Sequence, residues 1–116
     1  MFCPRRKTAT HAPQLAVDVF TYRLCAGIGE MLAALGQPPD AIVFTDAIGE
    51  TEPEIRTAAC KRFKFLGLKL NSPMNAASRV GTDIATAESS IRVLIIKARE
   101  NWQIARESLE LESTLR

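Results

Sequence analysis

The segment from Ala41 to Arg56 constrains the fold more than any other stretch of this chain. It begins with a four-residue apolar run that ends at Phe44. Because no polar residue alternates within this run, it is typical of a strand covered on both faces. A small, polar, glycine-bearing loop follows from Thr45 to Thr51, and a helix start comes next. A strand, a tight loop and a helix N-terminus in this order commonly bind phosphate groups, so the segment predicts an anion or nucleotide site.

The residues after this loop predict a helix that ends at Gly67. Thr51 to Glu54 form a capping-box pattern, in which Thr51 is the N-cap and Glu54 is the third helical residue. Apolar side chains then recur at helical spacing, at Ile55, Ala59, Phe63 and Leu66. Arg56 belongs to a set of basic residues that we expect to form a solvated face.

The rest of the chain alternates between helix and strand patterns. Residues 1–13 lack periodicity and predict an irregular tail, whereas residues 14–35 predict a long amphipathic helix that ends at Gly36. Residues 91–96 (IRVLII) give the strongest strand signal, because four of the six are β-branched. The other predicted elements are short strands at 68–70 and 83–86, a loop at 71–81 and a helix at 100–112.

This alternation predicts an α/β fold in which the two main strands pair in parallel. We expect a mixed sheet flanked by about three helices, formed by one domain at residues 14–116. Two apolar strands need cover on both faces, and three helices supply too little of it. Either the sheet is one-sided, or the chain leaves apolar surface and strand edges that a partner covers; we favour the second alternative.

Composition excludes several classes of function. The net charge of +2 gives no support for binding nucleic acid or a membrane surface. No apolar run approaches the length of a membrane span. Cys3, Cys25 and Cys60 are odd in number, widely spaced and form no CxxC pair, so a disulfide framework or zinc site is not expected. This cysteine usage favours the reducing cytoplasm.

Five motifs follow one another along most of the chain. They are LAVDVFTYRL at 15–24, AIVFTDAIGETEPEIR at 41–56, FLGLKL at 65–70, DIATAESSIRVLII at 83–96 and ENWQIARESL at 100–109. In this order they resemble the C-terminal portion of the acetate kinase (acetokinase) family, in register from about His11 to Leu109. The resemblance implies a partial actin-like domain of the sugar kinase and Hsp70 superfamily.

The resemblance also implies an activity and a set of site residues. Acetate kinases are cytoplasmic homodimers that transfer a phosphoryl group from ATP, with Mg²⁺, to acetate, giving ADP and acetyl phosphate. The loop formed by Ala47, Ile48, Gly49, Glu50 and Thr51 would match the segment along the adenosine and α-phosphate. Glu100 would match the C-terminal glutamate associated with the Mg²⁺ site. Glu100 also fits a structural role, because helix dipoles favour acidic residues in the first turn.

Three departures from the family pattern lie in the loop, one of which is Thr51 in place of the usual Asn. The family usually has Gly or Ala where this chain has Asp46, and Gly where it has Ala47. Alanine costs conformational freedom wherever φ must be positive. Asp46 would place a negative charge near a polyanionic ligand.

The resemblance further implies that the groups which grip acetate and the transferred phosphoryl lie outside this chain. We therefore expect no catalytic residue here, no activity from the chain alone, and a missing N-terminal half or a second copy as partner. The alternative is a non-catalytic nucleotide-binding or dimerisation module derived from the family. A decayed fragment that does not fold stably is the third hypothesis.

Overall fold

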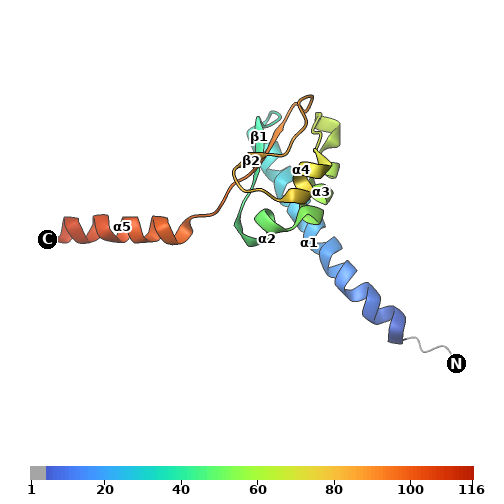
Figure 1. Cartoon of the computed structure of the whole chain (residues 1–116), viewed down its shortest axis with the longest axis horizontal. Coiled ribbons are helices and arrows are strands. Elements are labelled where there is room, and N and C mark those ends of the chain that lie inside the picture. Colours follow the sequence, from blue (N-terminus) through green and yellow to red (C-terminus); the bar gives the residue numbers. More distant parts are fainter. Residues whose placement is uncertain (1–4) are drawn as a thin grey trace.

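The computed structural model describes residues 5–116, with side chains from residue 12 onward. Its elements are α1 (Arg5–Leu35), β1 (Ala41–Phe44), α2 (Asp46–Thr51), α3 (Pro53–Arg62), the 3-10 helix η1 (Lys64–Leu66), α4 (Ser72–Ala77), β2 (Thr82–Asp83), β3 (Arg92–Ile95) and α5 (Glu100–Leu115). The strands and α3 form a central body, from which the N-terminal half of α1 and the whole of α5 project in different directions (Figure 1).

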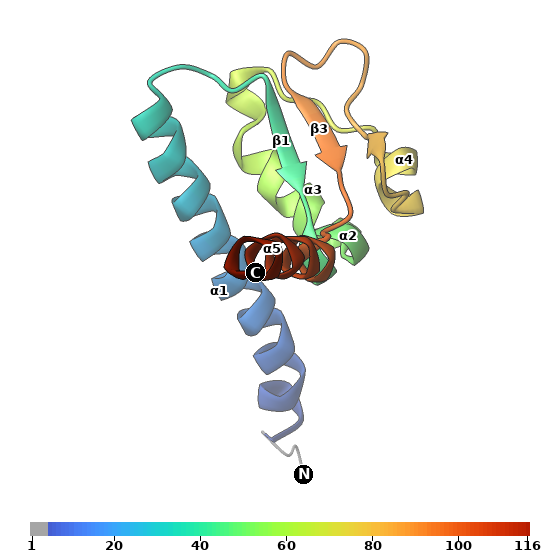
Figure 2. The same ribbon diagram turned by 90° about the vertical axis from the view of Figure 1, so that its left-hand side faces the viewer.

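The sheet has three strands in the order β1-β3-β2. β1 and β3 pair in parallel, with Ala41 opposite Arg92 and Phe44 opposite Ile95. β2 pairs with β3 in the antiparallel sense. This mixed α/β sheet confirms the predicted fold class and the parallel pairing of the two main strands. Figure 2 shows β1 and β3 side by side, with α3 behind them.

One face of this sheet carries the core. In β3 burial alternates, and the side chains of Val93 and Ile95 are fully buried. They pack in a cluster with residues of β1, α3 and the following segment, which include Phe44, Ala59, Cys60, Phe63 and Leu68. Four residues of α1 border the same cluster: Leu24, Cys25, Ile28 and Leu32. On the opposite face Val43 is 48% exposed, so within the described chain the helices cover one face of the sheet.

Several local predictions were wrong. The first helix begins at Arg5 and continues through Pro13, so the tail predicted at residues 1–13 is helical from residue 5. Residues 1–4, including Cys3, lie outside the described residues. The loop predicted at 71–81 contains α4, whose N-cap Asn71 accepts a hydrogen bond from the Met74 N–H. The strand predicted at 68–70 is a single bridge between Leu70 and Ala85.

Two helix ends were predicted correctly at glycine. Gly36 follows α1 with φ +73°, and Gly67 ends η1 with φ +86°. These left-handed conformations suit glycine, which lacks a Cβ. Their surroundings differ, because a Cβ at Gly36 would meet open space whereas one at Gly67 would overlap Ser90 Oγ. The Ser90 hydroxyl is held there by donating to the carbonyl of Leu66.

This difference gives a matched pair of variants. Gly36→Ala should lower the free energy of unfolding by about 1 kcal/mol, the cost of a left-handed alanine. Gly67→Ala should lower it by about 2–3 kcal/mol, because the overlap with Ser90 is added to the same backbone cost. Urea unfolding of both variants and the unchanged chain measures the difference. Equal losses would show that Ser90 does not crowd Gly67.

An ion pair joins β2 and β3, on the side of the sheet away from β1. Arg92 Nη1 donates to Asp83 Oδ2 at 2.9 Å, and the backbone N–H groups of Ala85 and Val93 donate to Asp83 Oδ1. Burial acts to raise the pKa of Asp83, but these backbone hydrogen bonds and the charge of Arg92 outweigh it and hold the pKa below its usual value.

A depressed carboxyl pKa makes stability depend on pH. The contribution of Asp83 is present above the unfolded-state pKa of about 3.9 and is lost as the pH falls through the lower folded-state pKa. Asp83→Asn should therefore be less stable than the unchanged chain at pH 7, by about 1 kcal/mol, because the pair is partly exposed. Denaturant melts from pH 7 to pH 2 should show the two proteins converging in acid. A constant difference across this range would contradict the assignment.

Candidate functional site

The loop that the sequence singled out forms a short helix in the structure. α2 begins one residue after β1, with Thr45 as its N-cap, and within α2 the Thr51 hydroxyl donates to the Ala47 carbonyl at 2.6 Å. Thr51 therefore ends α2 instead of capping α3, and the predicted capping box is wrong. The N-cap of α3 is Glu52, whose side chain makes no capping hydrogen bond, and Pro53 is its first residue. A proline fits this position because the first turn of a helix does not use its N–H.

The backbone turns sharply where β1 meets α2. Asp46 has φ +66°, and its Oδ1 accepts a hydrogen bond from the Ala47 N–H at 2.8 Å. Among the described residues Ser78 is the other non-glycine residue with positive φ, so Ala47 does not have the conformation that would require glycine. Gly49 is constrained by space, because a Cβ there would lie 3.2 Å from the carbonyl carbon of Phe44.

A cleft of about 410 Å³ lies beside this turn, between it and α1. Its lining residues come from α1, β1, the turn and the start of α3: Phe20, Leu24, Val43, Phe44, Thr45, Asp46, Ala47, Ile48, Gly49 and Ile55. The structure thus brings Ala47, Ile48 and Gly49 together at one cleft, and Ile48 is 46% exposed there. An apolar cleft with a polar turn at its edge can accept a flat ring together with a charged group.

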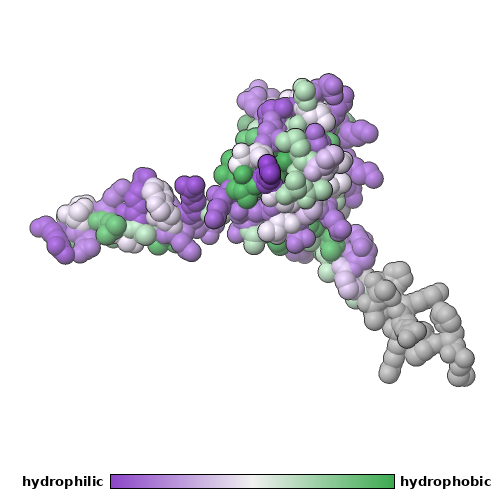
Figure 3. All heavy atoms as spheres, viewed as in Figure 1, coloured by the Kyte–Doolittle hydropathy of each residue, from purple (hydrophilic) through white to green (hydrophobic). Residues whose placement is uncertain are grey.

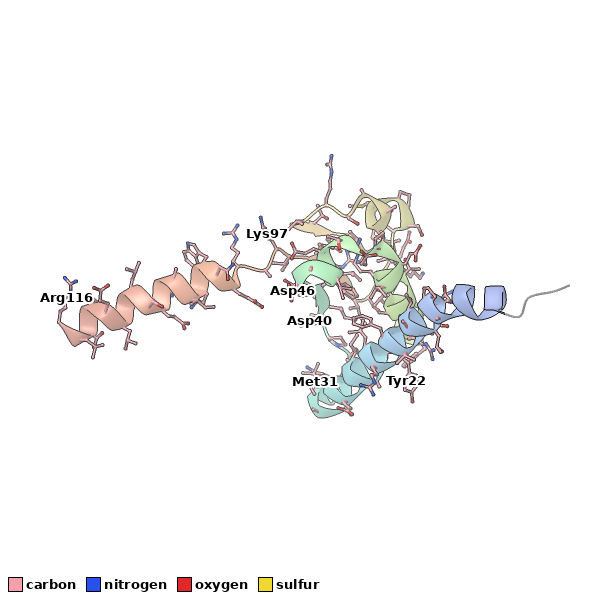
Figure 4. All side chains as sticks on the ribbon, turned by 90° about the horizontal axis from the view of Figure 1, so that it is seen from below. Tyr22, Met31, Asp40, Asp46, Lys97 and Arg116 are labelled. Carbon is pink, nitrogen blue, oxygen red and sulfur yellow. The ribbon has the colours of Figure 1, made fainter. Side chains whose placement is uncertain are left out.

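Glu50 connects this turn to the segment that leads to Glu100. Glu50 Oε2 accepts a hydrogen bond from the Ala98 N–H at 3.3 Å. Figure 4 shows Asp46 on the body and α5 leading away beyond Lys97. Glu100 is exposed in the first turn of α5. A purely structural role, as an acidic residue favoured by the helix dipole, would place it in this turn too. Among the side chains that the structure describes, from residue 12 onward, no three of His, Cys, Asp or Glu gather as a metal site would need.

Arg56 is the residue that sequence reasoning misjudged most. It was expected on a solvated face, yet its side chain is fully buried. Its Nη1 donates to the Gly49 carbonyl at 2.7 Å, and Nε donates to Asn75 Oδ1 at 2.7 Å. Nη2 donates to the Asn75 carbonyl at 2.8 Å and to Ser78 Oγ at 2.6 Å. One guanidinium therefore ties α2 and α3 to α4.

The sequence contained a signal for this role. A carbonyl four residues before a helical N–H is normally its acceptor, but Pro53 has no N–H to offer Gly49. Basic side chains often bind such terminal carbonyls, and Arg56 does so here. Asn75 completes the cluster by donating to the Pro53 carbonyl and to Thr57 Oγ1. Burial lowers the pKa of Arg56, and the negative charge of Glu52 opposes this effect. Arginine remains protonated in proteins.

A sequence model of the acetokinase family matches residues 4–106. This chain belongs to the acetokinase family. It is 51% identical over 98 residues to the acetate kinase of Trichormus variabilis and 50% identical over 98 residues to that of Nostoc sp. (strain PCC 7120). Each match covers 84% of this chain and 24% of the relative, so the chain spans about a quarter of the length of these relatives.

Solved structures agree with this assignment. The acetate kinase of Entamoeba histolytica matches 84% of this acetokinase chain with a TM-score of 0.75 and 30% identity. A propionate kinase from Francisella tularensis matches 88% of it with a TM-score of 0.72 and 26% identity. The chain covers 26% of each of these two proteins. They confirm the acetate kinase fold for the described body. Separately, no described helix is both long and apolar enough to cross a membrane.

The position of the positive φ can be tested at Asp46 and Ala47, two of the residues that depart from the family pattern. Asp46→Gly should raise the free energy of unfolding by up to about 1 kcal/mol, because glycine adopts this conformation without strain. Ala47→Gly should lower it by about 0.5–1 kcal/mol, because Ala47 is helical. Thermal and urea melts of both variants check the signs. The opposite signs would move the strained position from Asp46 to Ala47.

Proposed function

We propose that this acetokinase-family chain forms the nucleotide side of a kinase that transfers a phosphoryl group from ATP to acetate. In that reaction an acetate oxygen attacks the γ-phosphorus, the bond to the β,γ-bridging oxygen breaks, and ADP and acetyl phosphate result. The observation that carries the proposal is the cleft beside the β1–α2 turn, which contains Ala47, Ile48 and Gly49. Family membership adds the substrate class.

The residues of the turn divide into two roles. The side chain of Ile48 and the small residues on either side of it would contact the adenosine, since a flat ring packs well against apolar, low-bulk surface. Glu50 would act indirectly, because its carboxylate holds the Ala98 N–H and so fixes the approach to Glu100. Thr51 would support the turn through its bond to the Ala47 carbonyl.

Glu100 fits a Mg²⁺ ligand in its chemistry. Its carboxylate is exposed, and it takes part in none of the ion pairs of the described residues. Protein-bound Mg²⁺ keeps several waters and is held by one or two carboxylates together with substrate phosphates. When bound, the ion would neutralise charge on the β- and γ-phosphates. Glu100, just beyond the segment that Glu50 holds, would orient it through one of its waters.

The groups that grip acetate would come from polypeptide outside these 116 residues, since the relatives are about four times longer. The other partner that we propose is a second copy of the chain in a homodimer, which has the same sequence and would not supply these groups. We further propose a cytoplasmic location, which suits the free thiols of Cys25 and Cys60.

One observation favours a second candidate, a non-catalytic nucleotide-binding or dimerisation module. Asp46 lines the cleft with a negative charge, and such a charge repels a polyphosphate at short range. A chain that kept the fold and lost the reaction would tolerate this residue.

Calorimetric titration with ATP–Mg²⁺ tests the nucleotide site. The chain should show saturable binding, and Ile48→Ala should weaken it about five-fold, because exposed apolar contact is lost. Ile104→Ala on α5 is the matched control, since Ile104 is also exposed and lies outside the cleft. It should leave the affinity unchanged. Equal effects of the two variants, or no binding at all, would overturn the assignment.

A hydroxamate assay for acetyl phosphate separates the two candidates. The chain alone should give no turnover with ATP and acetate, because we place the acetate-binding groups elsewhere. Addition of the remaining part of an acetokinase should restore turnover if the chain is the nucleotide side of a kinase. Family-like turnover by the chain alone would contradict this division of labour, and no restoration would favour the non-catalytic module.

A further inference from the structure

The buried guanidinium of Arg56 differs from the other paired arginines of the described chain. Arg92, Arg106 and Arg116 each pair with a carboxylate, and all three pairs are partly or fully exposed. Arg56 is the fully buried one, and each of its four hydrogen bonds goes to a carbonyl, amide or hydroxyl oxygen. Each of its three nitrogens therefore has a hydrogen-bond partner, whereas its positive charge is not neutralised by a bonded anion.

An unpaired buried charge is costly, so its retention calls for a use. The nearby acidic residues do not cancel it by contact, although Asp46, which lines the same cleft and accepts from the Ala47 N–H, opposes its attraction for an anion. Glu52 acts on Arg56 through space but is exposed to water, which screens its charge. Glu50 is directed to the Ala98 N–H. The field of Arg56 thus reaches Gly49, which its Nη1 contacts and which lines the cleft.

We propose that Arg56 is an electrostatic positioning residue for the cleft: it fixes the β1–α2 turn through Gly49, and its uncompensated charge attracts the polyphosphate of a nucleotide bound there. Arg56 does not touch the ligand in this arrangement. The interaction acts across one peptide group, and it starts from a guanidinium that is itself fully buried, where charges are screened less than in water. The inference rests on the proposed nucleotide site, and it names the group that selects an anionic ligand over a neutral one.

A single substitution can neutralise this charge in place. Asn75→Asp keeps an acceptor for Arg56 Nε and forms an ion pair with it, while it loses the two bonds that Asn75 Nδ2 donates. Asn71→Asp is the matched control. It adds the same charge on the same α4 segment, and aspartate keeps the N-cap that Asn71 provides.

The probes are ATP–Mg²⁺ and adenosine, each titrated by calorimetry into folded protein checked by circular dichroism. Asn75→Asp should weaken ATP binding about ten-fold and leave adenosine binding within about two-fold, because adenosine carries no charge. Asn71→Asp should change neither affinity by more than about two-fold, since its charge is solvent-screened. A substitution that only disturbed the structure of the cleft would weaken the binding of ATP and of adenosine together.

A second pair of variants covers the case in which Asn75→Asp does not fold. Arg56→Lys and Arg56→Gln both lose the forked hydrogen bonding, but only the lysine keeps the charge. Both should bind adenosine more weakly than the unchanged chain, because the turn is less well fixed. Arg56→Lys should preserve the ratio of ATP to adenosine affinity, and Arg56→Gln should lower that ratio about ten-fold.

The outcomes distinguish a failure of the proposed Arg56 role from a failure of the proposed nucleotide site. Equal ATP-to-adenosine ratios in all the folded variants would overturn the role of the Arg56 charge and leave the nucleotide site intact. Absence of binding by the unchanged chain would overturn the proposed nucleotide site, and this inference with it. A fall in the ratio confined to Asn75→Asp or Arg56→Gln is the result that the structure leads us to expect.

Discussion

The hydrogen bond from Arg56 Nη1 to the Gly49 carbonyl is the contact on which the candidate site depends most. Pro53 cannot donate to that carbonyl, so without Arg56 the end of α2 would leave a polar group unpaired. The same guanidinium reaches Asn75 and Ser78, which belong to α4 and the residue that follows it. A turn, a core helix and a short surface helix therefore hold their positions through one buried side chain.

Helices of the body cover one face of its sheet and leave the other face exposed. Val93 and Ile95 are buried in the core cluster with residues of α3, while Val43 on the opposite face is half-exposed. α5 is exposed along its whole length, with apolar side chains among hydrophilic ones (Figure 3). At about 100° per residue, these apolar side chains form two separate stripes whose centres are about 130° apart. One contains Trp102, Ala105 and Leu109, and the other contains Ile104, Leu111 and Leu115. Such a helix is suited to contact with protein on two sides.

The elements set by periodicity and by local backbone chemistry could be predicted from the sequence. The β-branched run at 91–96 became β3, and Gly36 and Gly67 ended their helices with positive φ. The parallel pairing followed from the alternation of strands and helices. The extension of α1 back to Arg5 could not be predicted, because the residues before Gln14 lack an apolar face and include a proline.

The candidate site was harder to predict, because its main contacts are distant in sequence or depend on exact turns. Its candidate residues Ala47, Ile48 and Gly49 line one cleft. The segment that forms α2 was predicted to be a loop, because a six-residue helix shows too little periodicity in the sequence. Arg56 read as solvated because its acceptors Asn75 and Ser78 lie 19 and 22 residues away. Asp46 adopts a left-handed conformation, whereas Ala47, where the family usually has glycine, does not.

Nuclear magnetic resonance titration of the ¹⁵N-labelled chain with ATP–Mg²⁺ tests the central claim most directly, because it locates binding residue by residue. We predict that the amide signals of Ala47, Ile48, Gly49 and Glu50 shift in a saturable way, together with the Arg56 Nε–H signal. The signals of the distal part of α5 should stay in place. Saturable shifts confined to other elements, or none in the β1–α2 turn, would contradict the account.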